Sequence, residues 1–191
     1  TKNIVAYVSK NVVFSKYPSC ISGPFDQVDL RATQGDYEAE LVVAIGRTTR
    51  DVAAEDSWSY VAGLMVGQDI SDRELQLGAR PPQFGLGKSR DTYGPIGPVL
   101  VSPDSFADPD NLGITCDVNG ERRQDARTSS LIFDVSFLVS YLSSVLTLVP
   151  GDLIFTGTPA GVGMADGRFL KPGDVVMTSI EGIGTMKNVC Q

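Results

Sequence analysis

The sequence predicts an α+β domain that is mainly β, with a sheet that folds back on itself. Short apolar and β-branched runs, bounded by Gly, Pro, Asn and Asp, recur along the chain and indicate many strands. Only two segments have a convincing helical periodicity. No stretch with the composition of a linker divides the 191 residues, which are enough for one domain with a sizeable core.

The N-terminal half is predicted to hold several strands and one longer helix. Apolar residues between Asp51 and Val66 follow the spacing of an amphipathic helix, with Glu55 and Asp56 in its early turns. Residues 71–77 have a helical composition, and residues 78–87, which include Pro81-Pro82, are predicted to form a loop. Strands are expected over residues 3–8, 11–14, 27–30, 36–46, 64–70 and 95–102.

The C-terminal half begins with the strongest hairpin signal in the sequence, Asn119-Gly120 after the apolar residues 112–118. Apolar residues from Phe133 to Leu146 recur at helical spacing, and Asp134 is placed to cap that helix. Further strands are expected over 153–156, over 175–180 and after the glycine-rich turn 182–184.

Composition excludes several classes of partner. Sixteen basic and 23 acidic residues give a net charge of −7, which argues against nucleic acid and anionic membranes as partners. The longest apolar stretch, residues 131–149, is interrupted by Asp134 and by serines, so no membrane span is predicted.

The chain has no histidine and three cysteines, Cys20, Cys116 and Cys190. The absence of histidine excludes a Ser-His-Asp triad, a histidine-based zinc site and a histidine-activated thiolate. An odd number of cysteines without metal-site spacing indicates reduced thiols in the core and a cytoplasmic protein.

Candidate chemistry begins in the stretch from Asp36 to Gly46, where Glu38 and Glu40 precede a buried strand. In an extended strand, residues i and i+2 point to the same face, about 7 Å apart at Cα. Two carboxylates on one buried face repel each other, and a divalent cation between them would relieve that repulsion. The alternative is a solvated face on an edge strand.

Asp69, at the end of the next apolar run, is the natural third partner of Glu38 and Glu40. Because the set contains only carboxylates, a hard cation is favoured: Mg²⁺ or Mn²⁺ first and Ca²⁺ second. The alternative for Asp69 is a helix cap for residues 71–77.

Two glycine-containing segments are candidates for binding an anion. Lys88 follows Gly87, but Pro82 stands where a P-loop requires glycine, so a surface lysine is the alternative. Residues 156–163 lack the third glycine of a dinucleotide fingerprint. Their backbone N–H groups and the Thr158 hydroxyl are suited to an anionic ligand, and a tight strand connection is the alternative.

Seven segments together resemble, in the same order, the signatures of the fumarylacetoacetate hydrolase family, in its C-terminal catalytic domain. Such an ordered set is far more specific than any one segment, and it covers nearly the whole chain from about Phe14 onward. The segments are residues 37–41, 67–71, 87–92, 94–98, 147–152, 156–163 and 180–184.

The resemblance implies a mixed β-roll or sandwich with a few short helices, a homodimer, and a metal-dependent enzyme acting on small anionic 2-oxo or 2,4-dioxo acids. It implies that Glu38, Glu40 and Asp69 bind the divalent ion and that Lys88 is a catalytic residue in contact with substrate oxygens. Three further positions match residues that line the substrate pocket of the family: Arg73, Gln76 and Thr158.

Charge is consistent with this implication. Three carboxylates, a divalent ion and Lys88 balance to zero, and Arg73 adds one positive charge if it faces the same site. A fixed cation and an ammonium stabilise the negative charge of an enolate where it forms. Hydrolysis of an acylpyruvate and decarboxylation of oxaloacetate both pass through the pyruvate enolate, so one site serves either reaction.

One part of the family pattern is missing. Hydrolytic members carry a His and a Glu in a mobile N-terminal lid, and this chain has only about three residues between its first two expected strands. Either the lid is truly absent, or a lid segment near Val8 and the N-terminal region are missing from this sequence. We favour the second, because the rest of the site is intact and lids are commonly unstable segments. An intact mass several kDa above that of the sequence would support it.

The leading hypothesis is therefore a single catalytic domain, residues 1–191, of a metal-dependent hydrolase. It would cleave a C–C bond in an acylpyruvate-like or 2,4-dioxo acid. The alternatives are an oxaloacetate decarboxylase or a 2-oxo acid isomerase or hydratase on the same site, and a non-catalytic metal-binding paralogue.

Overall fold

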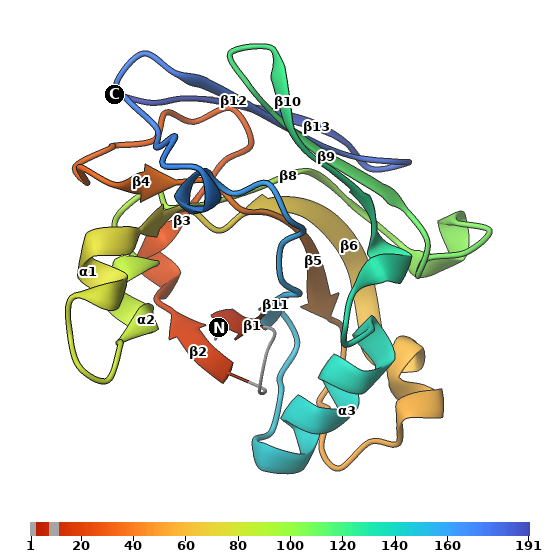
Figure 1. Cartoon of the computed structure of the whole chain (residues 1–191). Coiled ribbons are helices and arrows are strands. Elements are labelled where there is room, and N and C mark those ends of the chain that lie inside the picture. Colours follow the sequence, from red (N-terminus) through yellow and green to blue (C-terminus); the bar gives the residue numbers. More distant parts are fainter. Residues whose placement is uncertain (1–2, 8–11) are drawn as a thin grey trace.

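The computed structural model describes residues 3–7 and 12–191 of the chain. These residues form mostly strands, with few helices, and the largest sheet is curled, as predicted (Figure 1). The expected lid segment near Val8 lies outside the described residues.

The largest sheet has seven strands in the order β2-β1-β11-β5-β6-β8-β3. Two neighbouring pairs, β1 with β11 and β3 with β8, are parallel, and the other pairs are antiparallel. The strands are β1 (Asn3–Tyr7), β2 (Val12–Lys16), β3 (Ile21–Ser22), β5 (Ala39–Ile45), β6 (Val61–Gln68), β8 (Gly94–Val101) and β11 (Leu153–Phe155).

A four-stranded antiparallel sheet, in the order β10-β9-β12-β13, covers one side of the curled sheet (Figure 1). A separate pair, β4 with β7, lies beside them. The bounds are β4 (Gly35–Asp36), β7 (Ser71–Asp72), β9 (Gly113–Val118), β10 (Glu121–Arg127), β12 (Val175–Ile180) and β13 (Gly184–Val189).

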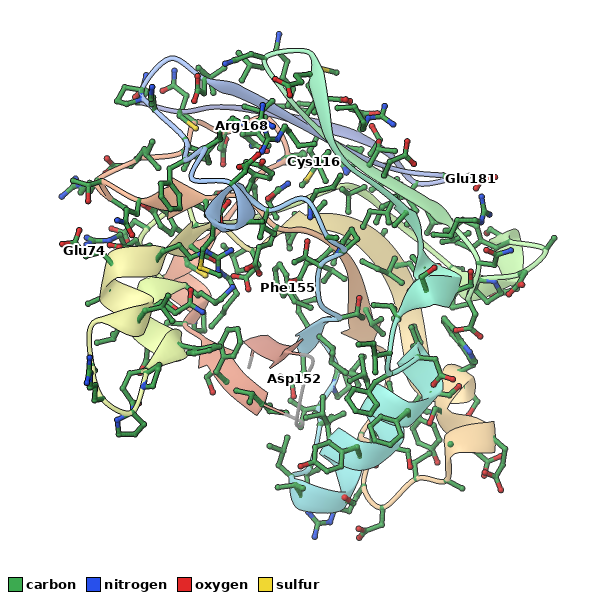
Figure 2. The ribbon with its side chains drawn as sticks, viewed as in Figure 1. Glu74, Cys116, Asp152, Phe155, Arg168 and Glu181 are labelled. Atoms are coloured by element: carbon green, nitrogen blue, oxygen red, sulfur yellow. The ribbon has the colours of Figure 1, made fainter. Side chains whose placement is uncertain are left out.

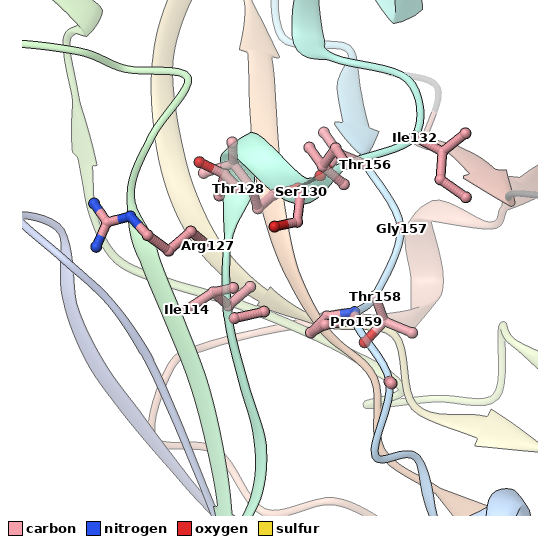
Figure 3. Close-up of a pocket in the computed structure, with 13 residues that line it drawn as sticks. Ile114, Arg127, Thr128, Ser130, Ile132, Thr156, Gly157, Thr158 and Pro159 are labelled. Atoms are coloured by element: carbon pink, nitrogen blue, oxygen red, sulfur yellow. Dashed lines mark hydrogen bonds between the residues drawn. The ribbon is translucent and has the colours of Figure 1, made fainter.

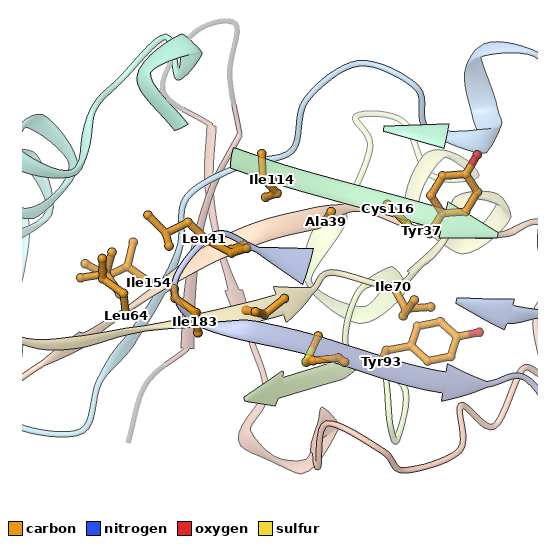
Figure 4. Close-up of a cluster of buried hydrophobic side chains, with 14 of the residues drawn as sticks. Tyr37, Ala39, Leu41, Leu64, Ile70, Tyr93, Ile114, Cys116, Ile154 and Ile183 are labelled. Atoms are coloured by element: carbon orange, nitrogen blue, oxygen red, sulfur yellow. The ribbon is translucent and has the colours of Figure 1, made fainter. Parts of the chain in front are cut away.

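Strand β5 separates two apolar clusters. Its odd-numbered side chains, such as Leu41, join Ile114 and Cys116 of β9 in the main core (Figure 4). Its even-numbered side chains, such as Val42, pack with Phe155 and Phe14 in a smaller cluster. Because side chains alternate along a strand, the acidic residues at even positions near its start face this second side.

The α-helices lie in two places: α3 at one end of the molecule, and α1 with α2 at another (Figure 1). α3 (Val135–Val145) packs beside η2 (Ala54–Tyr60), and Asp134 caps α3 by accepting a 2.7 Å hydrogen bond from Phe137 N. α1 (Arg73–Leu77) and α2 (Phe84–Gly87) lie close together near the start of β5. The remaining short helices are η1 (Pro18–Cys20), η3 (Pro103–Ser105), η4 (Thr128–Ser130) and η5 (Gly163–Ala165).

The hairpin between β9 and β10 turns at Asn119 and Gly120, as the sequence indicates. Both residues have positive φ values, 53° and 81°. A two-residue turn of this kind favours Asn followed by Gly, because both positions are left-handed. The strand over 175–180 and the capped helix starting after Asp134 are likewise found where expected.

Three element predictions differ from the structure. The helix expected from Asp51 to Val66 is only the 3₁₀ helix η2, because residues 61–66 pair with β5 and with β8 as the first part of β6. Residues 27–30 make no strand and pair through one isolated bridge at Val28. The predicted loop 78–87 contains α2, and Lys88 follows this helix directly.

The three cysteines are free and buried, as expected for core thiols. Cys116 lies between the two larger sheets (Figure 2). Burial raises the pKa of Cys20, and it raises the pKa of both Cys116 and Cys190 to about 12. Within the described part of the chain, no helix is long and apolar enough to cross a membrane.

Candidate metal centre

Strand pairing brings Glu38, Glu40 and Asp69 together. β5 and β6 are antiparallel with Ala39 opposite Gln68, so the start of one strand meets the end of the other. Asp69 N donates a 2.9 Å hydrogen bond to the carbonyl oxygen of Glu38. One carboxylate oxygen from each of the three side chains lies within 4.8 Å of the others. The sequence predicted this cluster, and it is no solvated face.

All three carboxylates are withdrawn from solvent, with Glu38 2%, Glu40 1% and Asp69 0% exposed. Burial, followed by repulsion from Asp69 and Glu38, raises the pKa of Glu40 well above its usual range. Burial also opposes ionisation of Asp69, but Lys16 and Lys88 outweigh it and lower the pKa of that carboxyl group. The cluster therefore holds one carboxyl group that resists ionisation and one that is held as a carboxylate.

Lys88 is buried at the centre of this cluster and is not a surface lysine. Its Nζ donates hydrogen bonds to Glu38 Oε2 at 2.7 Å, to Asp69 Oδ2 at 2.8 Å and to Ser71 Oγ at 2.8 Å. Burial opposes the charged form, but Asp69 and Glu38 prevail and raise the pKa of Lys88. The side chain is thus a fully hydrogen-bonded ammonium beside the trio.

The helix-cap alternative for Asp69 does not hold. Asp72, and not Asp69, caps α1 by accepting a 3.0 Å hydrogen bond from Leu75 N. Asp69 points both of its oxygens at lysines.

Arg73, on α1, is also buried and faces the trio. It forms ion pairs with Asp36 at 2.8 Å and with Glu38 Oε1 at 2.6 Å, so it adds positive charge to the site. Gln76 accepts a 3.0 Å hydrogen bond from Arg73. The side chain of Gln76 thus reaches the cluster through Arg73.

The glycine-rich segment that follows β11 encloses the acidic cluster. Gly157 N donates to Glu40 Oε2 at 2.8 Å, and Gly163 N donates to Asp36 Oδ1 at 2.6 Å. Gly161 has a φ of 106°, and a Cβ there would lie 2.0 Å from the carbonyl oxygen of Arg123, so only glycine fits. Two of the backbone N–H groups that were expected to bind an anion, those of Gly157 and Gly163, are thus bonded to side chains of the protein.

Two buried glutamines brace the backbone where β5 begins. β11 pairs with β5 only as far as Val42, which leaves the first residues of β5 without that neighbour. Gln68 Oε1 accepts from Glu38 N at 2.8 Å, and Gln124 Oε1 accepts from Ala39 N at 3.0 Å. Gln124 also donates to the Thr158 hydroxyl oxygen at 2.8 Å. These bonds fix both the acidic strand and the loop beside it.

A cavity of about 260 Å³ opens onto the cluster. Glu38 and Arg73 form its charged wall, and Thr158 lies on the loop wall. The remaining lining is largely apolar and includes Ile132 and Met164. A small acid with an apolar portion fits such a lining.

A second cavity, of about 220 Å³, lies across the same loop (Figure 3). It shares Thr158 and Pro159 with the first cavity, but it is lined by Leu41 and Ile114, which belong to the main core side of β5. It therefore lies away from the face that carries Glu40.

Sequence reasoning missed two charged residues of this site. Lys16 bonds to Asp69, and Asp36 bonds to Arg73 and to the glycine-rich loop. Asp36 begins the acidic stretch, so its position there was an available signal. Lys16 ends a strand that begins with three apolar residues, Val12 to Phe14, but nothing near it in the sequence identifies Asp69 as its partner.

The trio fits a hard divalent cation. Its ligands are carboxylate oxygens only, and a cation between them would relieve the repulsion that opposes ionisation of Glu40. Among the described residues, no other group of three or more Asp, Glu, His or Cys side chains lies close enough together to hold a metal ion.

Fold and site together define a class: a β-rich protein with a curled sheet and a buried, oxygen-only ligand set suited to a hard divalent cation. The chain belongs to the fumarylacetoacetate hydrolase family, because the family model described as fumarylacetoacetate (FAA) hydrolase C-terminal matches residues 2–191.

Three similar proteins illustrate the family. "Fumarylacetoacetate hydrolase domain-containing protein 2 homolog" of Dictyostelium discoideum is 43% identical over 197 residues, which cover 96% of this chain and 65% of that protein. "Oxaloacetate tautomerase FAHD2B, mitochondrial" of Bos taurus is 44% identical over 181 residues, covering 93% and 58%. Fumarylpyruvate hydrolase from Pseudomonas aeruginosa, solved with Mn²⁺ and pyruvate, has a TM-score of 0.89 and 29% identity, covering 100% and 89%.

The chain thus spans less than two thirds of the length of the first two relatives. Relatives in this family are named as enzymes, with tautomerase and hydrolase among the reactions in their names.

Proposed function

We propose that this chain is the catalytic domain of a metal-dependent hydrolase that cleaves a C–C bond in an acylpyruvate-like or 2,4-dioxo acid. One observation carries the proposal: three buried carboxylates converge within 4.8 Å beside a buried ammonium. The solved fumarylpyruvate hydrolase, with its Mn²⁺ and pyruvate, supports the same ion type and substrate class.

In this proposal Glu38, Glu40 and Asp69 hold Mg²⁺ or Mn²⁺, with Ca²⁺ as the lesser candidate. When bound, the ion supplies positive charge to polarise the 2-oxo group of the substrate. Lys88 is the proposed catalytic residue, because its ammonium lies at the cluster and supplies positive charge for the negative charge that forms on a substrate oxygen.

Arg73, Gln76 and Thr158 are the proposed substrate-binding residues. Arg73 and Thr158 line the cavity at the cluster. Gln76 fixes the guanidinium of Arg73, which contributes charge for an anionic substrate. The apolar part of the lining suits the acyl portion of the acid.

A tautomerase or decarboxylase acting on oxaloacetate is the second candidate. The name of the bovine relative, an oxaloacetate tautomerase, favours it. The same cluster serves this reaction, because enolisation and decarboxylation both place negative charge on the oxygen of a 2-oxo group. An isomerase or hydratase of 2-oxo acids and a non-catalytic metal-binding paralogue are the remaining alternatives.

The assembly and location of the protein are also proposed. We propose a homodimer, to be measured by light scattering on the purified chain. A cytoplasmic location stays a prediction. The bovine relative is named as mitochondrial, which favours testing that location too. We propose no nucleic-acid partner and no membrane partner, in keeping with the net charge of −7.

The deciding experiment offers purified protein an acylpyruvate and oxaloacetate in the presence of Mg²⁺ or Mn²⁺ and follows the products by NMR. Pyruvate with a carboxylic acid indicates hydrolysis, pyruvate with carbon dioxide indicates decarboxylation, and faster keto–enol exchange indicates tautomerisation. Glu40→Ala should abolish turnover, and Glu55→Ala, at an exposed position on η2, should keep it. Turnover that survives Glu40→Ala would contradict the proposed site.

A further inference from the structure

Lys16, the last residue of β2, is a buried lysine that has no role in the function proposed above. Only 1% of the residue is exposed. Its Nζ donates a 2.7 Å hydrogen bond to Asp69 Oδ1 and a 3.0 Å hydrogen bond to the carbonyl oxygen of Tyr93. It also donates to the carbonyl oxygen of Lys88. The three donors of an ammonium thus all have acceptors within the protein.

These three bonds join separate parts of the site. Lys16 comes from β2, Asp69 follows β6, and Lys88 and Tyr93 belong to the segment between α2 and β8. Burying an ammonium is costly, and complete pairing offsets that cost. The lysine is therefore placed to fix the relative positions of these segments.

The two lysines pair with different oxygens of the Asp69 carboxylate. Lys16 pairs with Oδ1, whereas Lys88 pairs with Oδ2 and also with Glu38 Oε2. Because Oδ2 shares its ammonium with Glu38, Oδ2 is the oxygen on the side of Glu38. The bond from Lys16 holds the opposite oxygen and so fixes the plane of the carboxylate.

We propose that Lys16 is a positioning residue of the metal centre: by holding Asp69 Oδ1, it directs Oδ2 toward the point shared with Glu38 and Glu40. This inference rests on the proposed function, since it needs those three residues to bind the ion. Partners that orient the ligands of a metal commonly change its affinity by about 10–100-fold when they are removed.

Charge alone makes the opposite prediction, which makes the inference testable. Removing a positive charge next to Asp69 would leave the cluster more negative and would tighten binding of a divalent cation. Loss of orientation would weaken binding, because Asp69 could then turn away from the other ligands. The direction of the change in affinity separates the two roles.

The test is a Mn²⁺ titration of the full chain, with free Mn²⁺ measured by electron paramagnetic resonance. Lys16→Met keeps the apolar stem and removes the ammonium, and we expect its Kd for Mn²⁺ to rise at least tenfold. Lys187→Met, at an exposed position on β13, is the control for loss of one positive charge and should leave the Kd unchanged. A melting curve in EDTA reports any loss of stability separately.

An unchanged or lower Kd in Lys16→Met would overturn the inference, even if the variant melts at a lower temperature, because a merely structural lysine affects only stability. If Lys16→Met does not fold, the same titration on Lys16→Gln decides: this side chain is shorter and uncharged, so we expect its Kd for Mn²⁺ to lie above that of the wild type, and a Kd equal to the wild-type value would overturn the inference. A wild-type chain that binds no Mn²⁺ would instead refute the proposed function.

Discussion

Replacing Glu40 by glutamine should make the metal-free protein more stable and the metal-loaded protein less stable. Glu40 is fully buried between Asp69 and Glu38, and these surroundings raise its pKa. Glutamine has the same shape without the charge. Its side-chain oxygen still accepts the hydrogen bond that Gly157 N donates to Glu40.

The sign follows from linkage. The folded-state pKa of Glu40 lies above that of an unfolded chain, so its protonated form favours folding at low pH. That contribution is lost as the pH rises through the folded-state pKa. At pH 8 folding of the wild-type chain must either bury the charged carboxylate of Glu40 or keep that group protonated, and both cost free energy. Glu40→Gln avoids this cost.

The magnitude follows from the cost of a buried charge. A buried charged group without compensation costs about 1–3 kcal/mol. Since 1 kcal/mol is worth about 2–4 °C in a chain of this size, avoiding that cost should raise the Tm of Glu40→Gln in EDTA by about 2–12 °C. Saturating Mn²⁺ at about 100 times its Kd stabilises the wild type by about 2.7 kcal/mol, and the variant should lose that gain.

The assay is a set of calorimetric melts at pH 6 and pH 8, with EDTA or with Mn²⁺. Glu55→Gln, an exposed position on η2, controls for neutralising a glutamate and should match the wild type in every condition. If Glu40→Gln melts below the wild type in EDTA, or gains as much from Mn²⁺, the reasoning about the buried trio is refuted.

Three further predictions concern binding, turnover and the scaffold. Ion binding requires Glu40 to lose its proton, so the apparent affinity for Mn²⁺ should rise up to tenfold per pH unit below the folded-state pKa of Glu40 and level off above it. An affinity that does not change with pH in calorimetric titrations would contradict this. Lys88→Met should lower kcat by roughly 10²–10³-fold while Mn²⁺ still binds, and unchanged turnover in steady-state kinetics would remove Lys88 from catalysis. Asp134→Ala removes the cap of α3 and should cost about 1 kcal/mol in urea unfolding, with the Kd for Mn²⁺ unchanged; equal stability would show that the cap bond is unimportant.

Much of the site was predictable from local pattern. Glu38 and Glu40 stand two residues apart at the start of an apolar run, and alternation along a strand places such residues on one face. Asp69 ends the next apolar run, and consecutive antiparallel strands bring the start of one beside the end of the other. Resemblance to a family added Lys88, whose burial no local pattern indicates.

The rest depended on contacts between distant segments. Lys16 lies 53 residues from Asp69 and was not identified, because nothing near it in the sequence reveals its partner. The sequence predicts a helix for residues 61–63 and both a helix and a strand for residues 64–66. Their spacing suits both periodicities, and pairing with β5 and β8 decides for the strand. Contacts between distant segments, rather than local propensity, therefore determine both the ion pair of Lys16 and the strand over residues 61–66.

The location of the ion is the most direct test of the central claim. We predict that crystals grown with Mn²⁺ and pyruvate will show one anomalous peak within coordination distance of an oxygen from each of Glu38, Glu40 and Asp69, with Lys88 contacting the pyruvate. A peak elsewhere, or a cluster that stays without Mn²⁺ at saturating concentration, would contradict it.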